Sequence, residues 1–136
     1  LNGTLAANGA RTVNPNYTGG GAGGSIFAVC KDFNPGPSAS LTAAGGDTAN
    51  GEGDLGGGGG GGRIALWVNV PTADQARLAA GQPPLMTLIA TNLNEYPTLT
   101  ASVTNGLGFV SGALAQPGTV RLMSGLVPPG TLLVIQ

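Results

Sequence analysis

The stretch GGGGGGGRIALWV (residues 56–68) decides the fold class of this chain. Its second half places Ile64, Leu66 and Val68 at alternate positions, which predicts a β-strand that buries one face. Its first half is a run of seven glycines. Glycine has no Cβ atom, so two glycine-rich backbones can approach closely and can follow extended, polyproline II-like paths. Because ordering glycine is entropically expensive, we expect such a run to be held by extra contacts, for which assembly is the natural source.

The same pattern occurs three times when the chain is aligned with itself. Each block contains a Leu-bearing strand, a glycine-rich segment and a second strand, and the blocks span residues 4–30, 40–70 and 98–124. The first-strand anchors Leu5, Leu41 and Leu99 are 36 and 58 residues apart. The second-strand anchors Ile26, Ile64 and Val120 are 38 and 56 residues apart. Periods of this length indicate stacked repeats, with residues 71–97 inserted between the second and third.

The aligned second strands predict which face is buried. One face should point inward and consists of Ile26, Ala28 and Cys30, then Ile64, Leu66 and Val68, then Val120, Leu122 and Ser124. The opposite face carries Phe27, Val29, Ala65, Trp67, Arg121 and Met123. Because this second face is still largely apolar, we expect the insertion, a terminal strand or another subunit to cover it.

The insertion predicts a short helix at about residues 73–80. Thr72 is placed as its N-cap with Gln75 at the capping-box position, and Gly81 is placed as its stop signal. Further strands are expected at 85–91, 99–103 and, at the end of the chain, 131–135. The fold class is therefore mostly β: a single domain over residues 1–136, built as a glycine-rich β-solenoid or a β-sandwich.

Composition excludes several classes of function. Only 8% of the residues are charged and the net charge is −1, which excludes a nucleic-acid binder. The chain contains no histidine, the commonest general base and metal ligand. No apolar stretch is long enough to span a bilayer. The chain begins at Leu1 without an initiating methionine, which is typical of a processed, secreted product.

The glycine-framed segments resemble the glycine-rich repeats of large bacterial surface proteins of the autotransporter-like kind. The resemblance rests on Gly3–Gly9, Gly23–Ile26, Gly61–Leu66 and Gly118–Leu122. It covers most of the chain outside residues 71–97. Those proteins are β-helices or β-solenoids, so the resemblance implies a structural role at the cell surface and no catalytic residues.

Candidate site residues are few. Asp47, Glu52 and Asp54 lie in one polar loop and are candidate calcium ligands, although a solvated turn is the favoured interpretation of this loop. Asn2 and Asn16 stand in N-glycosylation sequons. Cys30 is the single cysteine, so it is either a buried free thiol or a bridge between subunits. The glycines of residues 19–24 match a dinucleotide-binding pattern, but no helix is expected to follow them, so no cofactor is predicted.

These observations predict an extracellular structural protein and no enzyme. We expect a subunit of a self-assembling homopolymeric filament or cell-surface layer, because low charge leaves strand edges unprotected. The residues predicted to mediate assembly are Leu1, Leu5, Phe27, Trp67, Leu132 and Val134. The alternative is a glycan-binding or adhesive module of a larger surface protein.

Overall fold

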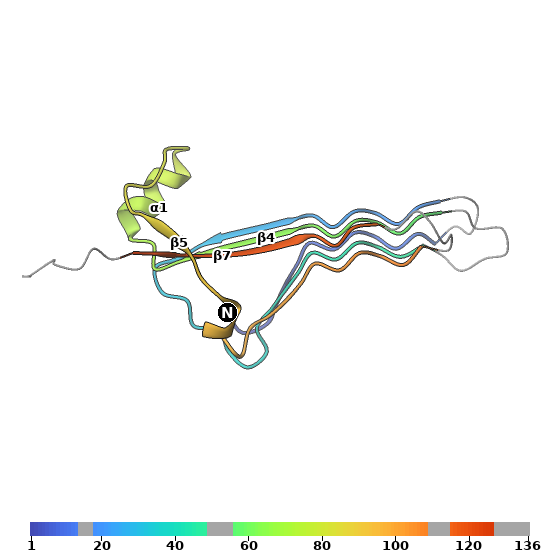
Figure 1. The fold of residues 1–136 in the computed structure, drawn as a ribbon, viewed down its shortest axis with the longest axis horizontal. Coiled ribbons are helices and arrows are strands. Elements are labelled where there is room, and N and C mark those ends of the chain that lie inside the picture. Colours follow the sequence, from blue (N-terminus) through green and yellow to red (C-terminus); the bar gives the residue numbers. More distant parts are fainter. Residues whose placement is uncertain (14–17, 49–55, 109–114, 127–136) are drawn as a thin grey trace, which may run out of the picture.

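The structure is a computed structural model that describes residues 1–13, 18–48, 56–108 and 115–126. Within these ranges the chain forms β-strands, one α-helix and one 3₁₀ helix (Figure 1). In chain order they are β1 (Thr4–Ala6), β2 (Ser25–Val29), β3 (Ser40–Thr42), β4 (Arg63–Val68), α1 (Thr72–Ala79), β5 (Leu88–Ala90), η1 (Leu93–Glu95), β6 (Thr100–Ser102) and β7 (Thr119–Gly125). The prediction of a mostly-β chain with one short helix is confirmed. The predicted strand at 131–135 lies outside the described residues.

The strands form two sheets. Sheet A has the order β1-β3-β6 and is parallel throughout. Sheet B has the order β2-β4-β7-β5, in which β5 alone runs antiparallel to its neighbour. We call β1 with β2 repeat 1, β3 with β4 repeat 2, and β6 with β7 repeat 3. Each repeat thus adds one strand to each sheet.

The predicted register of the second strands is confirmed. Ile26 pairs with Ile64, which pairs with Val120, and the residues two positions later pair in the same order. In sheet A, Leu5 pairs with Leu41 as expected, but Leu41 pairs with Ala101 and not with Leu99. The prediction for Leu99 was wrong by two residues, a shift that keeps a strand residue on the same face. Leu99 lies just before β6 and is buried in the core.

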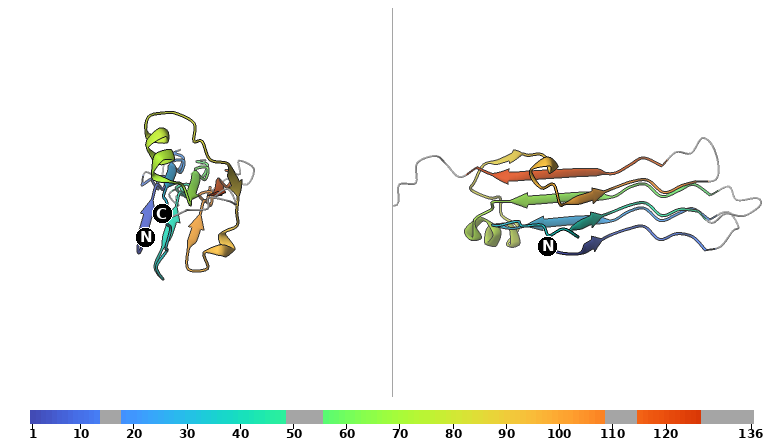
Figure 2. Two further views of the ribbon diagram at one scale, coloured as in Figure 1. Left: turned by 90° about the vertical axis from the view of Figure 1, so that its left-hand side faces the viewer. Right: turned by 90° about the horizontal axis from the view of Figure 1, so that it is seen from below.

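Between its two strands each repeat forms two extended segments, here called arms. The outgoing arm follows the first strand, and the returning arm leads into the second strand. The outgoing arms are residues 7–13, 43–48 and 103–108, and the returning arms are residues 18–24, 56–62 and 115–118. They lie side by side beyond the sheets (Figures 1 and 2). Outgoing arms continue the layer of sheet A, and returning arms continue the layer of sheet B.

The arms have the three-residue period of a polyproline II helix. The N–H groups of Gly20 and Gly23 both donate to the returning arm of repeat 2. Those of Gly21 and Gly24, one residue further on, both donate to the outgoing arm of repeat 1. A backbone with three residues per turn and no internal hydrogen bonds directs its N–H groups in this way to different neighbouring chains. The glycine segments are therefore bundled polyproline II-like backbones, hydrogen-bonded within and between the two layers.

Glycine is required where the arms touch. An ideal Cβ on Gly59 would lie 2.5 Å from the carbonyl carbon of Gly21, and closer still to its oxygen. An ideal Cβ on the next residue, Gly60, would meet only the Gln116 oxygen at 3.6 Å, an ordinary contact. The glycine run therefore contains, within a single turn, positions that have no space for a Cβ atom and positions that do.

The apolar core lies between the two sheets. Its buried members are Ala39, Leu41, Ala43, Ile64, Leu66, Val68, Leu99 and Leu122. The inward row of the central strand β4 supplies three of them, so the alternation predicted for this strand is confirmed. The core thus depends on the middle repeat, which is covered by a repeat on either side.

The helix ends as predicted but begins differently. Gly81 has a φ of 72°, and the N–H groups of Gly81 and Gln82 donate to the carbonyls of Leu78 and Arg77, a Schellman motif. The predicted capping box is wrong, because Thr72 is already helical and the cap residue Pro71 has no N–H for Gln75 to bond. The Gln75 Nε2 instead donates to the Val70 carbonyl at 2.8 Å.

No helix among the described residues is long and apolar enough to cross a membrane.

Candidate functional site

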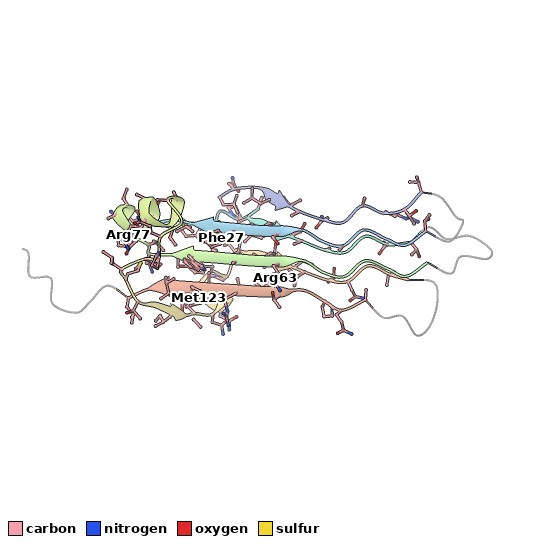
Figure 3. All side chains as sticks on the ribbon, turned by 90° about the horizontal axis from the view of Figure 1, so that it is seen from above. Phe27, Arg63, Arg77 and Met123 are labelled. Carbon is pink, nitrogen blue, oxygen red and sulfur yellow. The ribbon has the colours of Figure 1, made fainter. Side chains whose placement is uncertain are left out.

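The outer face of sheet B presents three rows of side chains. The register aligns Ser25, Arg63 and Thr119 in a first row, then Phe27, Ala65 and Arg121, then Val29, Trp67 and Met123. The rows therefore change from polar beside the arms to apolar at the far end. Figure 3 shows Phe27, Arg63 and Met123 on this sheet, with α1 confined to one end of it. The insertion, one of the three covers expected for this face, therefore leaves much of it open, and Phe27 is 58% exposed.

A shallow depression, here called the arginine furrow, lies over Ala65. It has a volume of about 430 Å³ and is lined by Arg63, Ala65, Thr119 and Arg121 together with Ile64 and Val120. A second hollow of about 410 Å³ adjoins it over the glycines of the returning arms and shares Arg63 and Thr119. The two hollows exist because Ala65 has a small side chain and the glycines have none. Within the described part of the chain, neither guanidinium of the furrow makes a hydrogen bond or an ion pair.

Two aromatic rings adjoin the arginine furrow. The rings of Phe27 and Trp67 have centroids 5.1 Å apart and an interplanar angle of 88°, an edge-to-face contact. Trp67 is partly buried, whereas Phe27 stands open. The structure therefore brings together two of the predicted assembly residues on one face. Arg63 was not singled out from the sequence, although the strand alignment contains the signal, since Arg63 immediately precedes the aligned residues.

The candidate calcium ligands are not assembled by the described residues. One Asp47 carboxylate oxygen accepts the N–H of Leu107 at 2.8 Å and so joins two neighbouring outgoing arms. Glu52 and Asp54 lie outside the described residues. No group of three or more Cys, Asp or Glu side chains suited to a metal ion occurs in the part of the chain that the structure describes.

Cys30 follows β2 and is partly buried. Its Sγ lies 3.7 Å from the Trp67 carbonyl oxygen, and burial, aided by the charge of Asp32, raises the pKa of the thiol. The neutral thiol is therefore favoured, which lowers its reactivity toward disulfides. The bridge between subunits stays a prediction.

Three of the remaining predicted residues lie at the repeat 1 end. Leu1 and Leu5 are exposed, as is the sequon residue Asn2. Asn16, Leu132 and Val134 lie outside the described residues. Leu5 occupies the register of the buried Leu41, so its exposure reflects its position at the end of the stack.

Comparison with known proteins found no matching family model, no matching curated protein and no matching solved structure.

Proposed function

We propose that this chain is an extracellular structural element, a β-solenoid-like stack of glycine-rich repeats that serves in a filament or cell-surface layer. The observation that carries the proposal is the bundle of arms, in which main-chain groups hydrogen-bond to main-chain groups and side chains are nearly absent. Such a bundle offers length and stiffness and presents few groups for chemistry. The resemblance of the sequence to the glycine-rich repeats of bacterial surface proteins implies the same structural role.

Self-association is proposed to use the open face of sheet B. Phe27 is the most exposed large apolar residue of that face, and its ring contacts the partly buried Trp67 edge to face. Because the chain carries little charge, electrostatic repulsion between copies is weak. Two copies that meet through these faces bury the Phe27 ring.

The test is sedimentation velocity and electron microscopy over a range of protein concentrations. We expect assemblies from the parent protein and a several-fold higher threshold concentration for Phe27→Ser. The control is Leu107→Ser, which removes a smaller but more exposed apolar side chain from an arm. Monodisperse monomers of the parent at high concentration would refute self-assembly.

A second candidate function is the binding of an anionic polysaccharide in the arginine furrow. The observation that favours it is a pair of guanidinium groups, free of partners among the described residues, beside an aromatic pair. Arginine pairs with carboxylates through two parallel hydrogen bonds, and aromatic rings pack on the apolar faces of sugars. A uronic-acid chain carries both features.

Calorimetric titration with polygalacturonate, and with dextran as a neutral control, tests this second function. We expect binding of polygalacturonate alone and a loss of about 10-fold or more in affinity for Arg121→Gln, since a charge-assisted hydrogen bond contributes about 1.5–3 kcal/mol. Arg11→Gln makes the same charge change on an exposed arm and should leave the affinity unchanged. Equal losses for both variants would show only a general charge effect and refute the site.

A further inference from the structure

The two ends of the stack differ in their main-chain hydrogen bonding. Within each layer, every bond between arms of consecutive repeats runs from an N–H of the earlier repeat to a carbonyl of the later one. In repeat 2, the acceptors toward repeat 1 are the carbonyls of Ala44, Asp47, Gly57 and Gly60, at 2.8–3.1 Å from their donors. The repeat 1 end should therefore present acceptors, and the repeat 3 end donors.

The repeat 1 end has its acceptors open. Alignment with repeat 2 identifies them as the carbonyls of Asn8, Arg11, Gly19 and Ala22, and none of these accepts a main-chain hydrogen bond from the described residues. An apolar side chain is open at the same end. Leu5 is 45% exposed, whereas its register partner Leu41, with a repeat on either side, is 2% exposed.

The repeat 3 end is closed in the layer of sheet B. The antiparallel strand β5 pairs with β7, from Leu88 opposite Gly125 to Ala90 opposite Met123, and occupies this edge. In the returning arm, Pro117 stands where repeats 1 and 2 have the donors Gly23 and Gly61. Proline has no N–H, so the returning arm of repeat 3 cannot donate the corresponding hydrogen bond to a further repeat. A second copy of this chain therefore cannot continue the layer by placing its repeat 3 on repeat 1.

We infer that the repeat 1 end is a docking surface for one more glycine-rich repeat, which precedes Leu1 in the same polypeptide and donates N–H groups to the open carbonyls of Asn8, Arg11, Gly19 and Ala22. A repeat of the design of repeats 1 and 2 has these donors, and it also covers Leu5. Stacking thus proceeds from the N-terminal side and ends at β5 and Pro117. The inference rests on the proposed solenoid-like role but requires neither filaments nor polysaccharide binding.

The test is an extended chain in which a copy of residues 1–36 is fused before Leu1. Because β1 and β3 pair at an offset of 36 residues, the copy enters in register. We expect the thermal midpoint to rise by about 4 °C or more and the glycine amides of the copy to become protected from hydrogen exchange. Fusion of the same copy after Gln136 should produce neither effect.

Variants of the copy test the packing. Gly23→Ala in the copy should cancel the rise, because a Cβ at this position meets main-chain atoms of the next repeat, whereas Ala22→Ser at an exposed position should keep it. In addition, Leu5→Ala in the original repeat should lower the midpoint several-fold more in the extended chain than in the parent. An unchanged midpoint with unprotected glycine amides, or an equal effect of Leu5→Ala in both chains, overturns the inference. So does a parent protein that dimerises with Leu5 buried, since the occupant is then a second copy. Filament assays play no part in these readouts, so the two proposals fail separately.

Discussion

Gly59 and Gly60 allow the role of glycine in the bundle to be tested at adjacent residues. Both have φ values outside the left-handed region, so an alanine is conformationally allowed at either position. They differ in their surroundings, because Gly59 is buried against the returning arm of repeat 1, whereas Gly60 is partly buried and has room for a Cβ. A comparison of the two alanine variants therefore isolates close packing from backbone entropy.

The expected cost of Gly59→Ala follows from the hydrogen bonds around it. A Cβ at 2.5 Å from the Gly21 carbon must move outward by at least about 0.9 Å to reach an ordinary contact of 3.4 Å, and further to clear the nearer Gly21 oxygen. That movement strains the bonds from Gly59 N–H to Gly46, from Gly106 N–H to Gly59, and from Gly46 N–H to Gly21. At about 0.5–1.5 kcal/mol per bond, about 1.5–4.5 kcal/mol is lost. The reduced entropy of the unfolded chain offsets about 0.4–1 kcal/mol of this loss, so the net destabilisation is about 0.5–4 kcal/mol.

Gly60→Ala should instead stabilise the protein by about 0.4–1 kcal/mol, because only the unfolded-state effect operates. Urea denaturation measures both variants, with circular dichroism and the fluorescence of the single tryptophan, Trp67, as probes. The two midpoints should move in opposite directions from the parent. A Gly59→Ala protein as stable as Gly60→Ala would refute the packing argument, since it would mean that the arms do not approach as closely as described.

The other predictions concern the core, the thiol and the arm register. Ile64→Ala should cost about 2–5 kcal/mol in denaturant unfolding, whereas Leu5→Ala should cost less than about 1 kcal/mol because Leu5 is half exposed. The raised pKa of Cys30 means that its contribution to stability is complete below the unfolded thiol pKa and is lost as the pH rises through the folded value. Unfolding titrations from about pH 8 to 11 should therefore show a steeper alkaline loss for the parent than for Cys30→Ser, and parallel curves would contradict this. One glycine inserted between Gly59 and Gly60 should abolish the cooperative transition in calorimetry, because it turns the rest of the arm by a third of a helical turn; an unchanged transition would contradict the three-residue period.

Much of sheet B could be predicted from the sequence because its strands carry strong side-chain patterns. Ile64, Leu66 and Val68 alternate regularly, and their counterparts in β2 and β7 align without gaps. Sheet A has short strands of small residues, so its signal is weak. The alignment chose Leu99 on residue identity, whereas the structure places Ala101 in register.

The functional features were harder to predict because they depend on main-chain geometry. The open carbonyl of Ala22 carries no side-chain signature, and the missing N–H of Pro117 acquires its meaning only once the layer bonds are known. The arginine furrow likewise depends on the small Ala65 lying between Arg63 and Arg121 across two strands. Residue types alone do not reveal that hollow.

The lengths of the repeats show where this architecture tolerates change. The segments between the paired strands differ in length, at residues 7–24, 43–62 and 103–118. The offset between repeats 1 and 2 is nevertheless constant within each arm. It is 36 residues along the outgoing arms, as far as Thr12, and 38 residues along the returning arms, from Gly20 onward. The difference therefore falls between these two residues, beyond the bonded parts of the arms. The insertion or deletion of one residue inside an arm would misplace every later glycine, because each turn of three residues contains both positions that exclude a Cβ atom and positions that accept one. The bundle thus fixes the spacing of its glycines with few side chains, and this explains why a chain so poor in chemical groups still has a strict sequence requirement.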